Sequence, residues 1–298
     1  MGKDFVALAQ ARIRQKVAVE DGTHAPILPT LHTMVHVRAA LPNANSEHYL
    51  SGRGQEATFD HLMNVIVPGL NGQNRSGRYW GFVTGSTLPI AEVADNIVSA
   101  YDQNVQVHLP DQSISTDVED AALKMLLALL KLGAPDQWTG RTFTTGATAS
   151  NILGLACGRE AVVASRLPDG SGSVGELGLL RACSKAGIEV IQVLTSMGHS
   201  SLSKAAAVVG LGRTSVKLLP LNDAEPWRLD IDAVERELQR EGVASIVSIS
   251  AGEVNTGRFA VTGIEDMKRL RSLADKYQAW IHVDGGIEHT KYEFGMSS

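Results

Sequence analysis

Short apolar runs alternate with amphipathic stretches from Arg141 to Asp284, and this alternation restricts the chain to few folds. The apolar runs predict strands at residues 142–145, 189–195, 216–220, 245–250 and 280–284, and the stretches between them predict helices at residues 149–165, 202–211, 231–241 and 264–277. Strands that alternate with helices pair in parallel through right-handed crossovers. The predicted fold class is therefore α/β, with a mostly parallel sheet and flanking helices.

The first hundred residues show helical spacing instead. Apolar positions predict helices at residues 5–19, 56–67 and 90–101, with a loop rich in glycine and aromatic residues at 69–89. A further helix is predicted at residues 116–132. We therefore expect an N-terminal helical and loop segment at residues 1–100, followed by a sheet-containing domain at residues 101–298.

Composition excludes several classes of partner. The net charge is −5 and no basic block stands out, which argues against nucleic acid as a partner. No apolar run approaches the length of a membrane span, and the N-terminus lacks the apolar core of a signal peptide, so no membrane association is expected. Cys157 and Cys183 do not form a CxxC pair, which indicates free thiols in a reducing compartment. The predicted location is cytoplasmic.

Two histidines have the spacing of metal ligands. His32 and His36 stand four residues apart, as two ligands on one helix would. No glutamate adjoins either of them to complete a zinc-protease motif. We interpret both as surface histidines and predict no metal site.

Three polar segments follow predicted strands. Asp284 ends the apolar run of AWIHVDGG, where open α/β sheets bind their ligands, or else it opens a solvated loop. Residues 144–151, TTGATASN, lie between a strand and a helix and would offer backbone N–H groups to a phosphate, or else an N-cap. His199 follows the strand that ends at Thr195 and would stack on a flat ligand, unless it only caps the next helix.

These three loops point to one edge of the predicted sheet. A planar, phosphorylated cofactor with a pyridine ring needs all three features: a helix N-terminus for the phosphate, a stacking side chain for the ring, and a carboxylate that keeps the ring nitrogen protonated. Pyridoxal phosphate has this structure, and its protonated ring acts as an electron sink. The combination therefore predicts pyridoxal phosphate as the cofactor.

Several segments resemble, in the same order, those of the group II pyridoxal-phosphate-dependent amino-acid decarboxylases, the superfamily of aromatic-amino-acid and glutamate decarboxylases. FTTGATASN is similar to the family's FTSGGTESN-type segment, GHSSLSKAAAVVGLG to its HxS segment, and WIHVDGG to its HVDAA or HVDGA strand end. RYWGFVTGSTLPIAEVAD and VSISAGEVNTG are similar to two further segments. The resemblance covers residues 78–286, and VHLPDQSISTDVED and GEVNTGRF are typical of a fungal branch.

The resemblance implies a fold-type-I large domain with known cofactor contacts. Ala147 and Thr148 would hold the phosphate, His199 would stack on the pyridine ring, and Asp284 would pair with the ring nitrogen. Glu253 stands where the family usually has a threonine near the cofactor, so it is a candidate cofactor contact whose role the resemblance does not define.

The resemblance also implies decarboxylation of a small-molecule amino acid, by a homodimer in the full-length form. The family's Schiff-base lysine lies beyond the strand-end aspartate, inside a His–Lys pair. Lys291 is separated from His289 by Thr290, and we interpret it as a solvated tail lysine. We therefore expect a partial cofactor-binding domain at residues 101–298, truncated before the rest of the large domain and the small domain, with no catalytic residue assigned and impaired activity.

Two alternatives stay open. The chain could be a non-catalytic truncated paralogue that dimerises with a full-length relative, or another fold-type-I lyase, such as a sphingosine-phosphate lyase, or a cysteine desulfurase. A nucleotide-dependent transferase is disfavoured because no dinucleotide fingerprint follows a strand. Borohydride-stable attachment of the cofactor would favour the enzyme, and co-purification with a longer relative would favour the partner.

Overall fold

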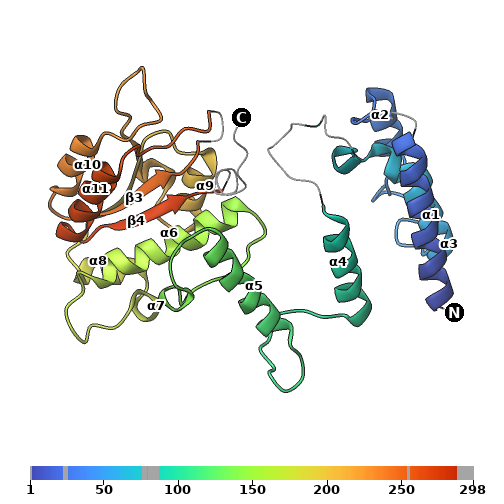
Figure 1. Ribbon diagram of the computed structural model, residues 1–298, viewed down its shortest axis with the longest axis horizontal. Helices are drawn as coiled ribbons and strands as arrows, with labels where there is room; N and C mark the ends of the chain where they lie inside the picture. Colours follow the sequence, from blue (N-terminus) through green and yellow to red (C-terminus); the bar gives the residue numbers. More distant parts are fainter. Residues whose placement is uncertain (1, 23–25, 76–78, 80–86, 254–255, 287–298) are drawn as a thin grey trace. The chain divides into compact units, whose positions relative to one another are not determined.

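A computed structural model describes residues 2–22, 26–75, 79, 87–253 and 256–286 (Figure 1). The chain divides into two compact units, Met1–Asn104 and Val105–Ser298. The first unit is helical, and the second contains the sheet. In the described part of the chain, no helix is both long enough and apolar enough to cross a membrane.

The first unit contains four α-helices among its described residues. They are α1 (Gly2–Gly22), α2 (Leu31–Ala39), α3 (Gln55–His61) and α4 (Pro89–Tyr101). Helix α3 continues through the π-helical turn η1 (Leu62–Ile66) into the 3-10 turn η2 (Val67–Gly69). A further 3-10 turn, η3 (Gln73–Arg75), follows. The helices predicted at residues 5–19, 56–67 and 90–101 are confirmed, whereas α2 was not predicted. Phe5 packs edge-to-face on Phe59 with ring centroids 5.9 Å apart, which joins α1 to α3.

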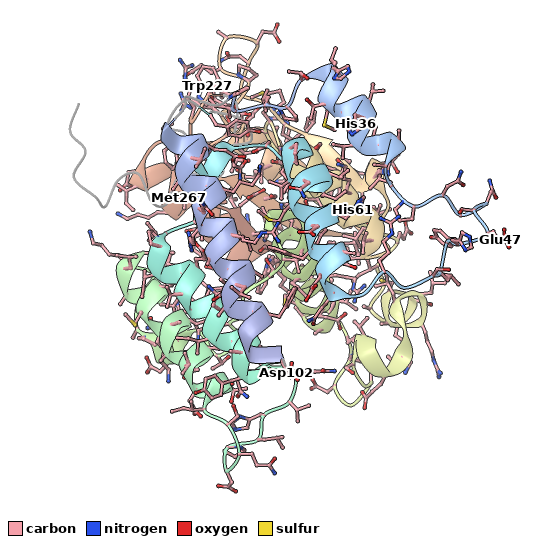
Figure 2. All side chains as sticks on the ribbon, turned by 90° about the vertical axis from the view of Figure 1, so that its right-hand side faces the viewer. His36, Glu47, His61, Asp102, Trp227 and Met267 are labelled. Carbon is pink, nitrogen blue, oxygen red and sulfur yellow. The ribbon has the colours of Figure 1, made fainter. Side chains whose placement is uncertain are left out.

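The two histidines considered as metal ligands both lie on α2. Figure 2 shows His36 on this helix and His61 at the end of α3. Within the described ranges, no three His, Cys, Asp or Glu side chains gather in a way that could hold a metal ion. His36 and Arg38 instead occupy the last turn of α2, where a positive charge interacts favourably with the helix dipole.

The second unit is α/β, as predicted. Its strands are β1 (Val190–Thr195), β2 (Val216–Leu218), β3 (Val243–Ser250) and β4 (Trp280–Asp284), and its helices are α5 (Ser115–Leu129), η5 (Pro135–Gln137), α6 (Ala147–Ala164), α7 (Val174–Leu177), α8 (Leu179–Lys185), α9 (Ser200–Val208), η6 (Arg213–Ser215), α10 (Ile231–Leu238) and α11 (Ile264–Lys276). The strands pair in parallel in the order β2-β1-β3-β4 (Figure 1). This order confirms the predicted parallel sheet.

Neighbouring residues of the central strands belong to two separate cores. Val193 and Ile246 lie in the core formed with α6 and α9. Leu194 and Val247 lie in the core formed with α10 and α11. Because successive strand residues point to opposite faces, apolar residues at consecutive positions produce a sheet that is buried on both sides.

The strand order reverses between β1 and β3. The connection from β1 through α9 leads outward to β2, and the connection from β3 through α11 leads outward in the other direction to β4. Open α/β sheets bind their ligands outside the carboxyl ends of the strands at such a reversal. Thr195 ends β1 and Asp284 ends β4, so the segments that follow both strands lie at this edge.

The strand predicted at residues 142–145 is wrong. Oγ1 of Thr142 donates to the carbonyl of Phe143, and Oγ1 of Thr144 donates to the carbonyl of Gly146, each at 3.0 Å. The side chain of Phe143 is exposed. The hydroxyl groups therefore satisfy nearby carbonyls in a turn that leads into α6, and no apolar layer covers the segment as it would cover a strand of this sheet.

Candidate functional site

Asp284 lies at the carboxyl end of β4, as predicted. It pairs with Ser250 of β3, and its backbone carbonyl accepts a hydrogen bond from Ala251 N at 2.9 Å. Its Oδ2 atom accepts a hydrogen bond from Asn151 Nδ2 at 3.0 Å. No described residue donates a hydrogen bond to the Oδ1 atom. One carboxylate oxygen is thus fixed, and the other has acceptor capacity to spare.

Asn151, on the second turn of α6, holds Asp284 in place. Its side chain is almost fully buried, with 2% exposed. Besides Asp284, Nδ2 contacts Ser201 Oγ at 3.1 Å, and Oδ1 lies 2.7 Å from His282 Nε2. Local patterns in the sequence predict no role for Asn151, Ser201 or His282. The available signal was position alone, since Asn151 closes the TTGATASN segment and His282 lies two residues before Asp284 on the same face of β4.

His199 joins this group through Ser201. It is the N-cap residue of α9, and its Nδ1 atom accepts a hydrogen bond from Ser201 N at 3.2 Å and lies 2.8 Å from Ser201 Oγ. The capping interpretation of His199 is therefore correct. The same contacts also link His199, through Ser201 and Asn151, to Asp284, so two of the predicted site residues belong to one hydrogen-bonded network.

The predicted phosphate turn opens α6. Gly146 is the N-cap residue of this helix and offers no side-chain acceptor to the first turn, whereas Thr144 bonds the Gly146 carbonyl and lies 2.7 Å from Ser150 Oγ. Ala147 and Thr148 are exposed at the first two helical positions. A Cβ atom built on Gly286 would lie 3.5 Å from Ala147 Cβ, so the turn after β4 passes beside the start of α6.

Glu253 is buried in the loop that follows β3, with 5% of its surface exposed. Its Oε2 atom accepts hydrogen bonds from the backbone N and the Oγ1 atom of Thr256, both at 3.0 Å. Its backbone carbonyl accepts a hydrogen bond from Gly257 N at 2.6 Å. These bonds connect Glu253 to Thr256 and Gly257, and a contact between Glu253 and a cofactor stays a prediction.

The electrostatics of the site centre on His282. Burial lowers the pKa of His282 below its usual value, and the Asp284 carboxylate opposes this shift. A buried imidazole with a lowered pKa is neutral near pH 7. Asp284 is therefore not paired with a permanent positive charge on its own strand.

Lys291 lies outside the described residues, together with the rest of residues 287–298. The interpretation of Lys291 as a tail lysine therefore stays a prediction.

Comparison with known proteins gives several relatives named as amino-acid decarboxylases, although no family model matches the chain. The chain is 28% identical over 202 residues to an L-2,4-diaminobutyrate decarboxylase of Acinetobacter baumannii, in a match that covers 66% of this chain and 38% of the relative. It is 23% identical over 238 residues to an L-aspartate decarboxylase of Metarhizium robertsii, covering 78% of this chain and 42% of the relative. A crystal structure of Oryza sativa TDC with PLP and tryptamine matches with a TM-score of 0.69 and 20% identity, over 94% of this chain and 56% of that chain.

The chain spans less than half of the length of these two curated relatives. Both sequence relatives are decarboxylases of amino acids, and the structural neighbour has the same fold. The predicted resemblance is therefore confirmed. The chain is similar to the group II pyridoxal-phosphate-dependent amino-acid decarboxylases.

Proposed function

We propose that the chain binds pyridoxal phosphate at the carboxyl edge of β1, β3 and β4, as part of an amino-acid decarboxylase. The decarboxylase relatives and the PLP in the crystal structure of TDC support this proposal. The observation that carries it is the hydrogen-bonded network of Asp284, Asn151, Ser201 and His199, because it brings two of the predicted ring contacts into one rigid group.

The chemistry of the described groups fits this cofactor. The Oδ1 atom of Asp284 has capacity to accept a hydrogen bond from a protonated ring nitrogen. The start of α6 offers the backbone N–H groups of Ala147 and Thr148, together with the positive end of the helix dipole, to a phosphate. His199 offers an imidazole face at the start of α9. When bound, pyridoxal phosphate supplies an electron sink for the electron pair left by carbon dioxide.

Each residue has a defined task in this proposal. Asp284 holds a proton at the ring nitrogen, and Asn151 keeps the carboxylate pointing toward it. His199 covers one face of the ring and excludes water from it. Glu253 is a further candidate contact, and its carboxylate is kept in position by Thr256.

The substrate class in the proposal is a small amino acid. The two named relatives act on 2,4-diaminobutyrate and aspartate, which are both short and carry a second charged group. No described residue favours one of these substrates over the other. Decarboxylation assays with a panel of acidic, basic and aromatic amino acids would identify the substrate.

Cofactor binding tests the proposal directly. Pyridoxal phosphate is titrated into the full chain and into the variants Asp284→Asn and Asp275→Asn, and binding is followed by quenching of tryptophan fluorescence. We expect Asp284→Asn to weaken binding about tenfold or more, because a charge-assisted hydrogen bond is lost. Asp275→Asn is the matched control, since Asp275 pairs with Arg271 on the surface of α11. Failure of the wild-type chain to bind, or equal binding by Asp284→Asn, would overturn the proposal.

Covalent attachment is a separate part of the proposal. The resemblance assigns no lysine of this chain to the attachment, so we expect reversible binding and slow or absent decarboxylation by the chain alone. Reduction of the complex with borohydride, followed by peptide mapping, measures this. Cofactor fixed on Lys291 would contradict the expected impairment and would justify amino-acid decarboxylation assays of the chain itself.

The remaining part of the proposal concerns assembly and location. We propose that a full-length form acts as a homodimer in the cytoplasm, without nucleic acid, and that a truncated form would pair with such a full-length relative. Light scattering of the chain, alone and mixed with a full-length relative, measures both kinds of pairing. A monomer in both samples would contradict this part.

A further inference from the structure

One buried amide connects three elements of the second unit. Asn151 lies on α6, Ser201 on α9, and His282 and Asp284 on β4. The amide has two N–H donors and one carbonyl acceptor, and each of these meets a partner: Nδ2 meets Ser201 Oγ and Asp284 Oδ2, and Oδ1 meets His282 Nε2. Both N–H donors and the carbonyl oxygen of this amide therefore have partners on α9 and β4.

The chemistry of the partners determines which way the amide faces. An ionised carboxylate only accepts hydrogen bonds, so the –NH₂ group of Asn151 must face Asp284. If the amide were turned over, its oxygen would face Asp284 Oδ2 at 3.0 Å, the distance at which the N–H group now donates, and both atoms would be acceptors. The carbonyl oxygen of the amide is thereby directed at His282.

His282 must then carry its proton on Nε2. Oδ1 of Asn151 only accepts, and it lies 2.7 Å from Nε2. The lowered pKa of His282, which burial causes and Asp284 opposes, leaves the ring neutral with Nδ1 unprotonated. The ring also packs against Gly154 of α6, where a Cβ atom would lie 2.5 Å from Cε1.

The second N–H of Asn151 sets the direction of the bonds toward His199. This N–H donates to Ser201 Oγ, so the hydroxyl proton of Ser201 is left to point at His199 Nδ1. The same Nδ1 atom accepts the backbone N–H of Ser201, which can only donate. Nδ1 of His199 is therefore an acceptor, and a neutral His199 carries its proton on Nε2.

We propose that Asn151 is a positioning residue that orients the Asp284 carboxylate, holds His282 in the Nε2-protonated form and, through Ser201, connects the Asp284 carboxylate to His199. This proposal rests on the proposed function in one respect, which is the identity of the ligand that Asp284 and His199 contact. The directions of the hydrogen bonds do not depend on a bound ligand. Groups held in advance by such bonds need not be reordered when a ligand binds.

The experiment reads the histidine tautomers by ¹⁵N NMR of the full chain without cofactor. Long-range N–H correlations distinguish an Nε2–H ring from an Nδ1–H ring, and His199→Gln and His282→Gln spectra assign the two signals. In the wild-type chain we expect both rings as Nε2–H. An Nδ1–H form of either ring would overturn the proposal.

Two variants test the role of the amide. Asn151→Asp keeps the shape of the side chain but replaces both donors with acceptors, and it places a second carboxylate beside Asp284. We expect the His199 signal to shift, because the Ser201 hydroxyl turns toward the new carboxylate, while the backbone N–H of Ser201 keeps the ring in the Nε2–H form. Ser201→Ala removes only the link to His199, so it should change the His199 signal and leave the His282 signal as in the wild type. This second variant decides the question if Asn151→Asp does not fold.

Asn222→Asp is the matched control. The Oδ1 atom of Asn222 accepts the backbone N–H groups of Ala224 and Glu225, both at 2.9 Å, and an aspartate can do the same. We expect wild-type spectra from this variant. Unchanged His199 signals in both Asn151→Asp and Ser201→Ala would overturn the proposal.

Titration of the same proteins with pyridoxal phosphate separates this proposal from the proposed function. We expect Asn151→Asp to bind about tenfold more weakly than Asn222→Asp, the loss typical of a buried hydrogen-bond partner left unpaired. If the histidine signals respond as expected and no protein binds the cofactor, the positioning role stands and the proposed function fails. If the wild type binds and Asn151→Asp binds equally well with unchanged histidine signals, the positioning role fails.

Discussion

Gly154 on α6 lies directly against the imidazole of His282 on β4. A Cβ atom at residue 154 would stand 2.5 Å from Cε1 and 2.6 Å from Nδ1 of the ring. One turn further along α6, a Cβ atom on Gly158 would stand 2.7 Å from Cδ1 of Trp280. Two glycines one helical turn apart thus let α6 approach the end strand of the sheet closely enough for Asn151 to reach Asp284.

Gly154→Ala should destabilise the chain. Overpacking a filled site lowers the free energy of unfolding by about 1–3 kcal/mol, and the higher helix propensity of alanine relative to glycine offsets about 1 kcal/mol of this loss. We expect a net loss of stability, measured as a lower urea midpoint by circular dichroism. Gly175→Ala, in α7, is the control, because the nearest atom to its Cβ would be Ser173 Oγ at 3.8 Å. A midpoint as high for Gly154→Ala as for the control would contradict the packing argument.

Acid should weaken the native state through His282. Its pKa in the folded chain lies below the value of an exposed histidine, about 6.5, because of burial. Its contribution is therefore fully present above that value and is lost as the pH falls, since the unfolded chain binds the proton more readily. We expect the urea midpoint of the wild type to fall between pH 7.5 and pH 5.5 more steeply than that of His282→Gln. Parallel pH dependences would show that another group is responsible.

Asp230 stabilises the start of α10. Its Oδ1 atom accepts the backbone N–H of Ala233 at 2.9 Å, and it is the N-cap residue of the helix. Asp230→Ala should cost about 1 kcal/mol of unfolding free energy, whereas Asp230→Asn retains the acceptor and should cost only a fraction of that. Urea unfolding measures both variants. Equal losses would assign the effect to the charge of Asp230, which lies 3.6 Å from Arg236, and not to the cap.

The two thiols should differ in reactivity. Burial raises the pKa of Cys183, although Arg159 opposes the shift, so less of this thiol is ionised at pH 8. Cys157 is exposed. We expect iodoacetamide to label Cys157 several-fold faster than Cys183, as measured by mass spectrometry of the labelled peptides. Faster labelling of Cys183 would mean that its surroundings open in solution.

The strand that ends in Asp284 shows what the sequence could predict. Residues 280–284 were predicted with the bounds that β4 has, because an apolar run followed by two glycines is a local signal. The helices α7 and α8 were missed because they span four and seven residues and contain or follow glycines, which leaves no periodic pattern to detect. Local periodicity therefore accounts for the long elements and not for the short ones.

The residues of the candidate site also fall into two groups, those that local sequence patterns predict and those that they do not. His199 and Asp284 were predicted because His199 follows a strand and Asp284 ends one, and both lie in the network described above. Asn151 lies within the TTGATASN motif but has no predicted role, since its bond to Asp284 spans 133 residues and leaves no trace in local spacing. The strand predicted at 142–145 failed because threonine favours strands but also bonds nearby carbonyls in turns.

The 133-residue span of the bond between Asn151 and Asp284 also bears on how the protein is made. Helix α6 can form as soon as its own residues leave the ribosome, but Asn151 meets its carboxylate only after β4 has emerged and paired with β3. Closing so long a loop costs conformational entropy before the stabilising contacts form, so this step comes late in folding. Binding at this edge would therefore report that the whole second unit has folded, and a nascent chain arrested before residue 284 would give no such signal.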